Sequence, residues 1–134
     1  MIAAQIALTE AELESRDSPA AQSMLKRLRA ARLAFEQVVD FIAGNGKANP
    51  NAAYAGSVPY LMLAGNLVAG WQMARALMVA EDQLAKGVGD AAFLRAKVVT
   101  ARFYSEHLLS KAPGMRDAII EGADSVTGLA VEAF

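Results

Sequence analysis

The chain has 134 residues, of which 54% are hydrophobic and 20% are charged. This length fits one domain, and the apolar share is large enough to form a core, which argues against disorder. The 13 basic and 14 acidic side chains leave a formal net charge of −1, so nucleic acid is not expected as a main partner. The sequence has no cysteine, which excludes disulfides and thiolate metal sites and favours a cytoplasmic location.

Two apolar stretches have the composition of targeting or membrane segments. Residues 1–8 are short and lack a basic start, so a secretory signal is not expected. Residues 58–74 carry no charge, but they contain Pro59, Asn66 and two glycines, and Arg75 follows them. A run of this length with amide side chains inside it is typical of a buried helix. No membrane partner is therefore expected.

The first expected helix is a short leader. Thr9 and Glu12 have the spacing of a capping box, which predicts a helix over about residues 10–16. Ser18 then stands before Pro19, the arrangement of an N-cap followed by proline at the first helical position.

The second expected helix runs over about residues 19–43. Its apolar side chains recur at alternating spacings of four and three, which is typical of a helix packed lengthwise against its neighbours. They are Met24, Leu28, Ala31, Phe35, Val38 and Ile42. Gly44, Asn45 and Gly46 tolerate positive φ and are expected to end this helix.

The third expected helix follows a loop at residues 47–51 and continues to about Lys86. Pro59 lies inside its pattern, so the helix should start just before this proline or bend there. Gly87 and Gly89 are expected to end it. Small residues along it would let another backbone approach closely, namely Gly56, Gly65, Ala69 and Gly70.

The fourth expected helix spans about residues 90–110, with Asp90 as its N-cap. Its apolar side chains cover more than one face, so it should be central in the fold. Pro113 and Gly114 are expected to form a turn. A last helix then shows the four-three pattern over residues 115–133, which predicts that the chain end is docked.

No segment shows sustained alternation of period two, and the short loops favour antiparallel neighbours. The expected fold is all-α: an antiparallel four-helix bundle with a short N-terminal leader helix. We expect a single helical domain over residues 1–134, with a leader segment at 1–17 and the bundle at 18–134.

Groups for catalysis are sparse. The one histidine is His107, and Ser105 would point to a different side of the same helix, so a nucleophile beside a base is not expected. Glu106 and His107 are adjacent, which is the wrong spacing for a carboxylate-bridged di-metal site. No glycine-rich loop follows a strand. We therefore expect no catalytic, cofactor-binding or metal-binding residue in this chain.

The candidate site is a set of polar side chains within the apolar third and fourth helices. Its members are Asn66, Trp71, Arg75, Lys97, Arg102, Tyr104 and His107. They would form a polar pocket or an interface, and a small-molecule pocket near Arg102 and Tyr104 is the weaker version of this idea. The favoured alternative is a satisfied buried network with solvated ends, because buried polar groups must be paired whatever their role.

Several motifs resemble those of one enzyme family. They are Asn49-Pro50-Asn51-Ala52-Ala53, Val58-Pro59-Tyr60-Leu61, Gly65-Asn66-Leu67-Val68-Ala69-Gly70-Trp71, Ala96-Lys97-x-x-Thr100-Ala101-Arg102-Phe103-Tyr104-x-Glu106-His107-Leu108-Leu109 and Gly122-Ala123-x-Ser125-Val126. In this order they are similar to the C-terminal helical domain of the acyl-CoA dehydrogenases, in the 3-methylmercaptopropionyl-CoA dehydrogenase-like branch. The resemblance covers about residues 19–134.

The resemblance implies an oxidoreductase in which FAD takes a hydride from the β-carbon of an acyl-CoA after a glutamate removes the α-proton. It places the flavin and the glutamate in upstream domains, so FAD is implied for the full-length enzyme and no residue of this chain is implied as catalytic. The chain would pack on those upstream dehydrogenase domains and support assembly into a homo-oligomer. An exposed apolar patch is then expected where the other domains lie.

The alternative hypothesis is a standalone helical module that self-associates or binds a protein partner. The nearly complete set of helix patterns suggests a fold that can stand alone, and the small residues of the third helix would permit a close contact with another subunit.

Overall fold

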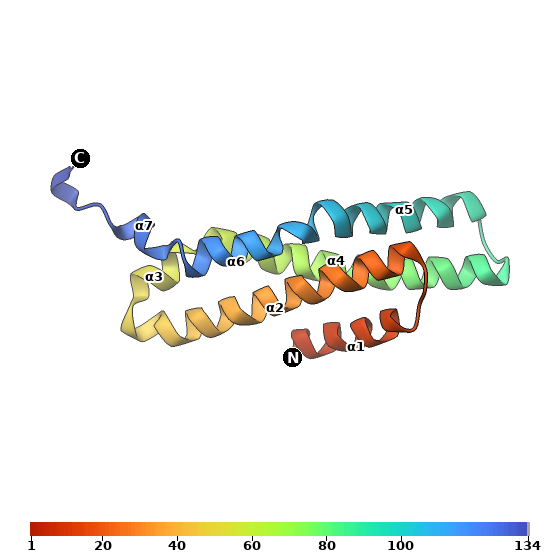
Figure 1. Cartoon of the computed structure of the whole chain (residues 1–134), viewed down its shortest axis with the longest axis horizontal. Helices are drawn as coiled ribbons and strands as arrows, with labels where there is room; N and C mark the ends of the chain where they lie inside the picture. The colour runs from red at the N-terminus through yellow and green to blue at the C-terminus, as the bar shows by residue number, and fades with distance from the viewer. Residues whose placement is uncertain (134) are drawn as a thin grey trace.

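The computed structural model describes residues 1–133, and these residues contain helices and no strand. Figure 1 shows a long bundle whose main helices share one axis. The α-helices are α1 (Ile2–Glu14), α2 (Pro19–Ala48), α3 (Pro50–Ala55), α4 (Ser57–Lys86), α5 (Ala91–His107), α6 (Ala112–Ile120) and α7 (Ala123–Thr127), with short 3₁₀ turns at Leu109–Lys111 and Val131–Ala133. Within this range, no helix combines the length and the apolar character that crossing a bilayer requires.

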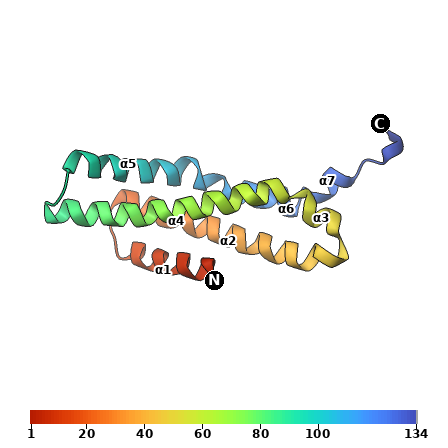
Figure 2. The same ribbon diagram turned by 180° about the vertical axis from the view of Figure 1, so that it is seen from behind.

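The predicted all-α bundle is confirmed, but its columns differ from the predicted ones. Figures 1 and 2 show four antiparallel columns: α1, α2, α4, and a composite column in which α6 continues α5. The leader is thus itself a column. α2 and α4 have 30 residues each and are about 45 Å long, whereas the 13 residues of α1 reach only about 20 Å.

One core joins the four columns, and α1 contributes Ile6 and Leu13 to it. The predicted four-three pattern of the second helix is confirmed. Met24, Leu28, Ala31 and Val38 are buried, and Phe35 and Ile42 pack against the core.

The predicted N-caps at Ser18 and Asp90 are confirmed. The Ser18 side chain accepts a hydrogen bond from the backbone N–H of Ala21, and the Asp90 side chain accepts hydrogen bonds from the N–H groups of Ala92 and Phe93. The predicted end of the third helix is confirmed too, because Gly87 caps α4 in the left-handed region with φ 66°, where glycine carries no steric cost.

The first helix starts earlier than predicted. α1 begins at Ile2, so Thr9 lies in mid-helix and is no capping residue. Its buried hydroxyl donates to the carbonyl of Gln5 at 3.3 Å and accepts from Trp71 Nε1 at 2.8 Å. The side chain that suggested a cap therefore serves to dock α1 on α4.

The second helix does not end at Gly44-Asn45-Gly46 as predicted. α2 continues to Ala48, and neither glycine adopts positive φ. Glycine permits a turn but does not require one. The helix stops only where Pro50 disfavours a helical conformation at Asn49. The loop expected at residues 47–51 is therefore mostly helical.

The third predicted helix is divided at Gly56 into α3 and α4. The start just before Pro59 is confirmed, and the proline lies in the first turn, where a missing N–H breaks no helical hydrogen bond. A Cβ at Gly56 would lie 2.7 Å from Ile119 Cγ2, so the absent side chain lets α6 pack closely here.

The C-terminal part departs most from the prediction. Pro113 and Gly114 lie in the first turn of α6, which begins at Ala112, and do not form a separate turn. The last predicted helix is interrupted between Ile120 and Ala123 and ends at Thr127. The chain end is not docked: Figure 1 shows it extending away from the bundle, and its apolar side chains are exposed, namely Val126, Leu129 and Val131. Gly122 and Gly128 flank α7. They weaken a continuous helix here because glycine in a helix costs about 1 kcal/mol relative to alanine.

The fourth predicted helix is not central. α5 buries Leu94, Ala101 and Ser105, whereas Phe93, Val99 and Phe103 are 57%, 67% and 55% exposed. Its apolar residues do cover more than one face, but one of those faces has no neighbour among residues 1–133.

A buried charge cluster holds α1 on α2. Glu10 is only 3% exposed, and its carboxylate accepts hydrogen bonds from Arg32 Nε at 2.7 Å, Arg32 Nη2 at 3.0 Å and Arg29 Nε at 3.3 Å. A buried carboxylate is tolerable only when it is paired in this way. Arg16, just after α1, forms ion pairs with Glu81 and Asp82 of α4.

A second close contact joins α4 to the composite column. Leu109 is fully buried, and a Cβ at Gly70 would lie 2.6 Å from its Cδ2 atom. Gly65, one turn earlier on α4, is exposed, and a Cβ there would meet nothing within 4 Å.

The two glycines predict opposite effects of the same substitution. Gly65→Ala should raise the free energy of unfolding by about 0.5–1 kcal/mol, because alanine favours the helix. Gly70→Ala should lower it, because overpacking costs about 1–3 kcal/mol. Urea denaturation of both variants measures the difference. Equal stabilities would contradict the Gly70–Leu109 contact.

The Glu10 cluster predicts a large effect at Arg32. Arg32→Ala should lower the free energy of unfolding by about 3 kcal/mol, because it removes a partner of a buried carboxylate. Arg102→Ala is the control, since it breaks an exposed pair with Glu106 and should have a much smaller effect. Thermal or urea unfolding measures both, and similar losses for the two variants would show that Glu10 is not a buried charge.

Candidate interaction surface

The seven polar residues of the candidate set lie at several separate places. Asn66 and Tyr104 meet, because the Tyr104 hydroxyl donates to the Asn66 carbonyl at 3.3 Å. Burial raises the pKa of the Tyr104 phenol. Trp71 and Arg75 also meet, with the guanidinium 5.7 Å from the centre of the indole ring. Lys97 is on α5, and among the described residues it makes no hydrogen bond to either pair.

Lys97, Arg102 and His107 contact side chains of their own helix, α5. Lys97 Nζ lies 5.1 Å from the centre of the Phe93 ring, and the His107 ring stacks on Phe103 at 4.5 Å. Arg102 Nε donates to Glu106 Oε1 at 2.9 Å, which lowers the pKa of that carboxyl. These side chains are exposed and form no common pocket with Tyr104.

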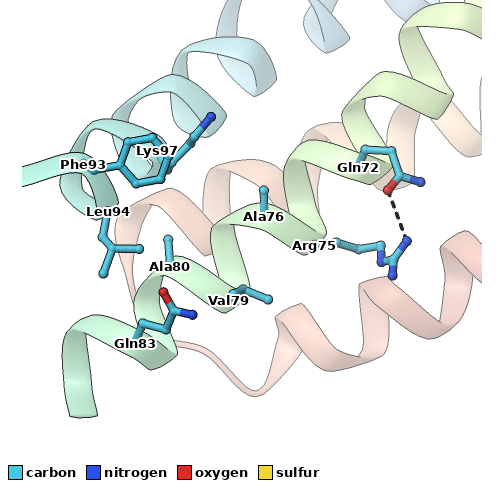
Figure 3. Close-up of a pocket in the computed structure, with 9 residues that line it drawn as sticks. All are labelled: Gln72, Arg75, Ala76, Val79, Ala80, Gln83, Phe93, Leu94 and Lys97. Atoms are coloured by element: carbon cyan, nitrogen blue, oxygen red, sulfur yellow. Dashed lines mark hydrogen bonds between the residues drawn. The ribbon is translucent and has the colours of Figure 1, made fainter. Parts of the chain in front are cut away.

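A hollow of about 420 Å³ lies between α4 and α5, and Figure 3 shows its lining. We call it the α4/α5 groove. It is lined by Gln72, Arg75, Ala76, Val79, Ala80, Gln83, Phe93, Leu94 and Lys97. Two candidate residues, Arg75 and Lys97, lie in it, whereas Arg102 and Tyr104 do not.

The α4/α5 groove is apolar between two cations. In Figure 3, Lys97 lies beside Phe93 and Arg75 extends towards Gln72, whose Oε1 accepts a hydrogen bond from Arg75 Nη1 at 3.1 Å. Over residues 1–133, neither cation takes part in a salt bridge with a carboxylate. Such a surface suits an apolar partner that carries acidic groups at its edge.

Catalytic groups do not converge. Ser105 is fully buried and donates to the carbonyl of Arg102 at 2.7 Å, while His107 is exposed; the prediction that they point apart is confirmed. Ser105 Oγ lies 2.9 Å from Ser23 Oγ, a contact between α2 and α5 that the sequence reasoning missed. Throughout the described range, no three His, Asp or Glu side chains are placed to hold a metal ion.

The residues of the groove do not fit a flavin. A dinucleotide cofactor is held by backbone N–H groups at a helix start or in a glycine-rich loop. One wall of the groove is the second half of α4, where these groups bond within the helix. The other wall is the first turn of α5, where the N–H groups of Ala92 and Phe93 donate to the Asp90 side chain and that of Leu94 donates to the Asp90 carbonyl. Across residues 1–133, no buried side-chain N or O atom lacks a partner.

A second hollow, of about 390 Å³, was not predicted from the sequence. We call it the α2/α4 hollow. It is lined by Val39, Ile42, Ala43, Ala53, Tyr54, Ser57 and Tyr60. The available signal was the apolar pattern of the second helix, which continues past Phe35 to Val39 and Ile42.

Comparison with known proteins gives the family. The family described as Acetyl-CoA dehydrogenase C-terminal like matches residues 2–130, so the match includes α1 as well as the motifs that carried the resemblance. A relative from Ruegeria pomeroyi, 3-methylmercaptopropionyl-CoA dehydrogenase, is 44% identical over 124 residues. The aligned region is 92% of this chain and 21% of the relative, so the chain spans about a fifth of that protein's length. The chain belongs to the Acetyl-CoA dehydrogenase C-terminal like family.

Proposed function

We propose that this chain is the C-terminal helical domain of an FAD-dependent acyl-CoA dehydrogenase and that it acts by packing on the catalytic domains. The flavin accepts the hydride from the acyl-CoA in such an enzyme, and the groups that hold it and remove the proton lie outside this chain. The proposal includes a single domain over residues 1–134, a cytoplasmic location and assembly into a homo-oligomer.

The apolar outer face of α4 and α5 is the observation that carries the proposal. Val79 and Phe93 line the α4/α5 groove, and Val99 and Phe103 are further exposed apolar side chains of α5. Burying one such side chain stabilises by about 1.5–3 kcal/mol, and contiguous apolar patches on a protein surface mark interaction sites. A catalytic domain seated here would bury these side chains.

A second candidate function is self-association as a standalone module. It is favoured by Leu61, Gly65 and Val68, which are exposed on α4 at helical spacings of four and three. The open space at Gly65 would let a second helix come close. Because this row continues into the groove through Gln72 and Val79, a second copy and a catalytic domain would compete for the same face.

A chimera tests the proposed packing. Residues 2–130 replace the matching segment of the Ruegeria enzyme, and Val79→Glu and Leu8→Glu are introduced separately. The two side chains are 55% and 59% exposed in this chain, so each change should leave the isolated domain's stability within about 0.5 kcal/mol. In the chimera, Val79→Glu should lower the flavin-release temperature by about 2–4 °C for each kcal/mol lost, while Leu8→Glu should not.

Two outcomes would contradict the proposal. One is a chimera in which both variants release flavin at the temperature of the unsubstituted chimera. The other is flavin reduction by the purified chain itself after addition of FAD and 3-methylmercaptopropionyl-CoA. For the self-association alternative, sedimentation of the chain across a dilution series should show a dimer that Gly65→Leu dissociates.

A further inference from the structure

The face of α2 and α4 that binds α1 continues beyond α1. On α2, Arg29 and Arg32 bond to Glu10, and steps of four, three and four from Arg32 lead along the same side to Val39 and Ala43. These last two residues line the α2/α4 hollow.

The other wall of the hollow also continues the face that binds α1, here on α4. Trp71 of α4 bonds to Thr9 of α1. Steps of seven, four and three back along α4 lead to Ala64, Tyr60 and Ser57, which share a side of the helix with Trp71. Tyr60 and Ser57 line the hollow, so α1 and the hollow lie on one face of the α2–α4 pair.

The short length of α1 leaves this part of the face open. α1 is about 25 Å shorter than α2 and α4, and the Arg16 ion pairs tie its C-terminal end to the last part of α4. Figure 1 shows its N-terminus pointing along the bundle towards the α3 end, where the hollow lies. The composite column covers the opposite face over its whole length, since α6 packs on both α2 and α4.

We propose that the α2/α4 hollow seats the polypeptide that immediately precedes α1 in the longer dehydrogenase. The proposal rests on the proposed function, because the chain spans about a fifth of its relative and catalytic domains would join it through α1. The seated segment should be apolar and uncharged where it meets the hollow, since no charged side chain lines it. In helical form it would add up to about 25 Å to the α1 column.

The uncharged lining of the hollow favours this occupant over the chain's own C-terminal segment. After Arg116 the sequence carries Asp117, Glu121, Asp124 and Glu132 and no basic residue. The hollow offers no cation to this acidic segment, whereas the α4/α5 groove offers Arg75 and Lys97. An uncharged segment that enters along the α1 axis needs no cation in the hollow.

Cysteine accessibility tests the inference, because the chain has no cysteine of its own. Val39→Cys places a thiol in the hollow, Ala43→Cys is a second variant in case the first folds poorly, and Leu8→Cys on the outer side of α1 is the control. Each is treated with a thiol reagent in the isolated chain and in the Ruegeria chimera, and the labelled peptides are quantified by mass spectrometry.

In the isolated chain all three thiols should react readily. In the chimera, the thiols at positions 39 and 43 should react at least about tenfold more slowly, since a packed segment must open before the reagent enters, and the thiol at position 8 should not change. The inference is overturned if the thiols at positions 39 and 43 react as fast in a flavin-containing chimera as in the isolated chain. If Val79→Glu still destabilises that chimera, the proposed function is kept.

Two further results have distinct meanings. Slow labelling at positions 39 and 43 in the isolated chain that becomes slower with protein concentration would show that a second copy occupies the hollow, which also overturns the inference. If the thiols at positions 39 and 43 react freely in the chimera and Val79→Glu has no effect there, the proposed function is contradicted as well.

Discussion

Leu109 can lie against α4 only because position 70 has no side chain. This contact fixes the point where α5 gives way to α6, and it holds both helices on α4 as one column. The α4/α5 groove lies between this contact and the turn that connects the two helices. The close approach of α6 at Gly56 repeats the same solution near the other end of α4.

Local chemistry made some elements predictable. The caps at Ser18 and Asp90 and the stop at Gly87 depend on residues within four positions of the helix end, and these predictions were right. The helix through Gly44 and the start of α1 at Ile2 were not predicted, because glycine permits a helix as well as a turn and because the Thr9 hydroxyl has a partner on α4, far away in the sequence.

The candidate surface was less predictable than the fold. An apolar side chain gives the same signal in a sequence whether it is covered by its own domain or by another, so Phe93 and Phe103 suggested a central helix although they are exposed. The polar residues were grouped by shared helices, but their partners are set by side-chain reach, as Arg102 with Glu106 shows. The motifs gave the family because they preserve order and spacing over most of the chain.

The antiparallel arrangement has a kinetic consequence. Each column packs on the next one along the chain, and the Glu10 cluster joins positions only 19 and 22 residues apart. Helical proteins with such local contacts have low contact order and fold within about microseconds to milliseconds. At a synthesis rate of roughly 5–20 residues per second, each hairpin can form while the next helix is still being made. The hairpins of α1 with α2 and of α2 with α4 can therefore form before the composite column, which supplies Leu109 and Ile119 to the core, has been made.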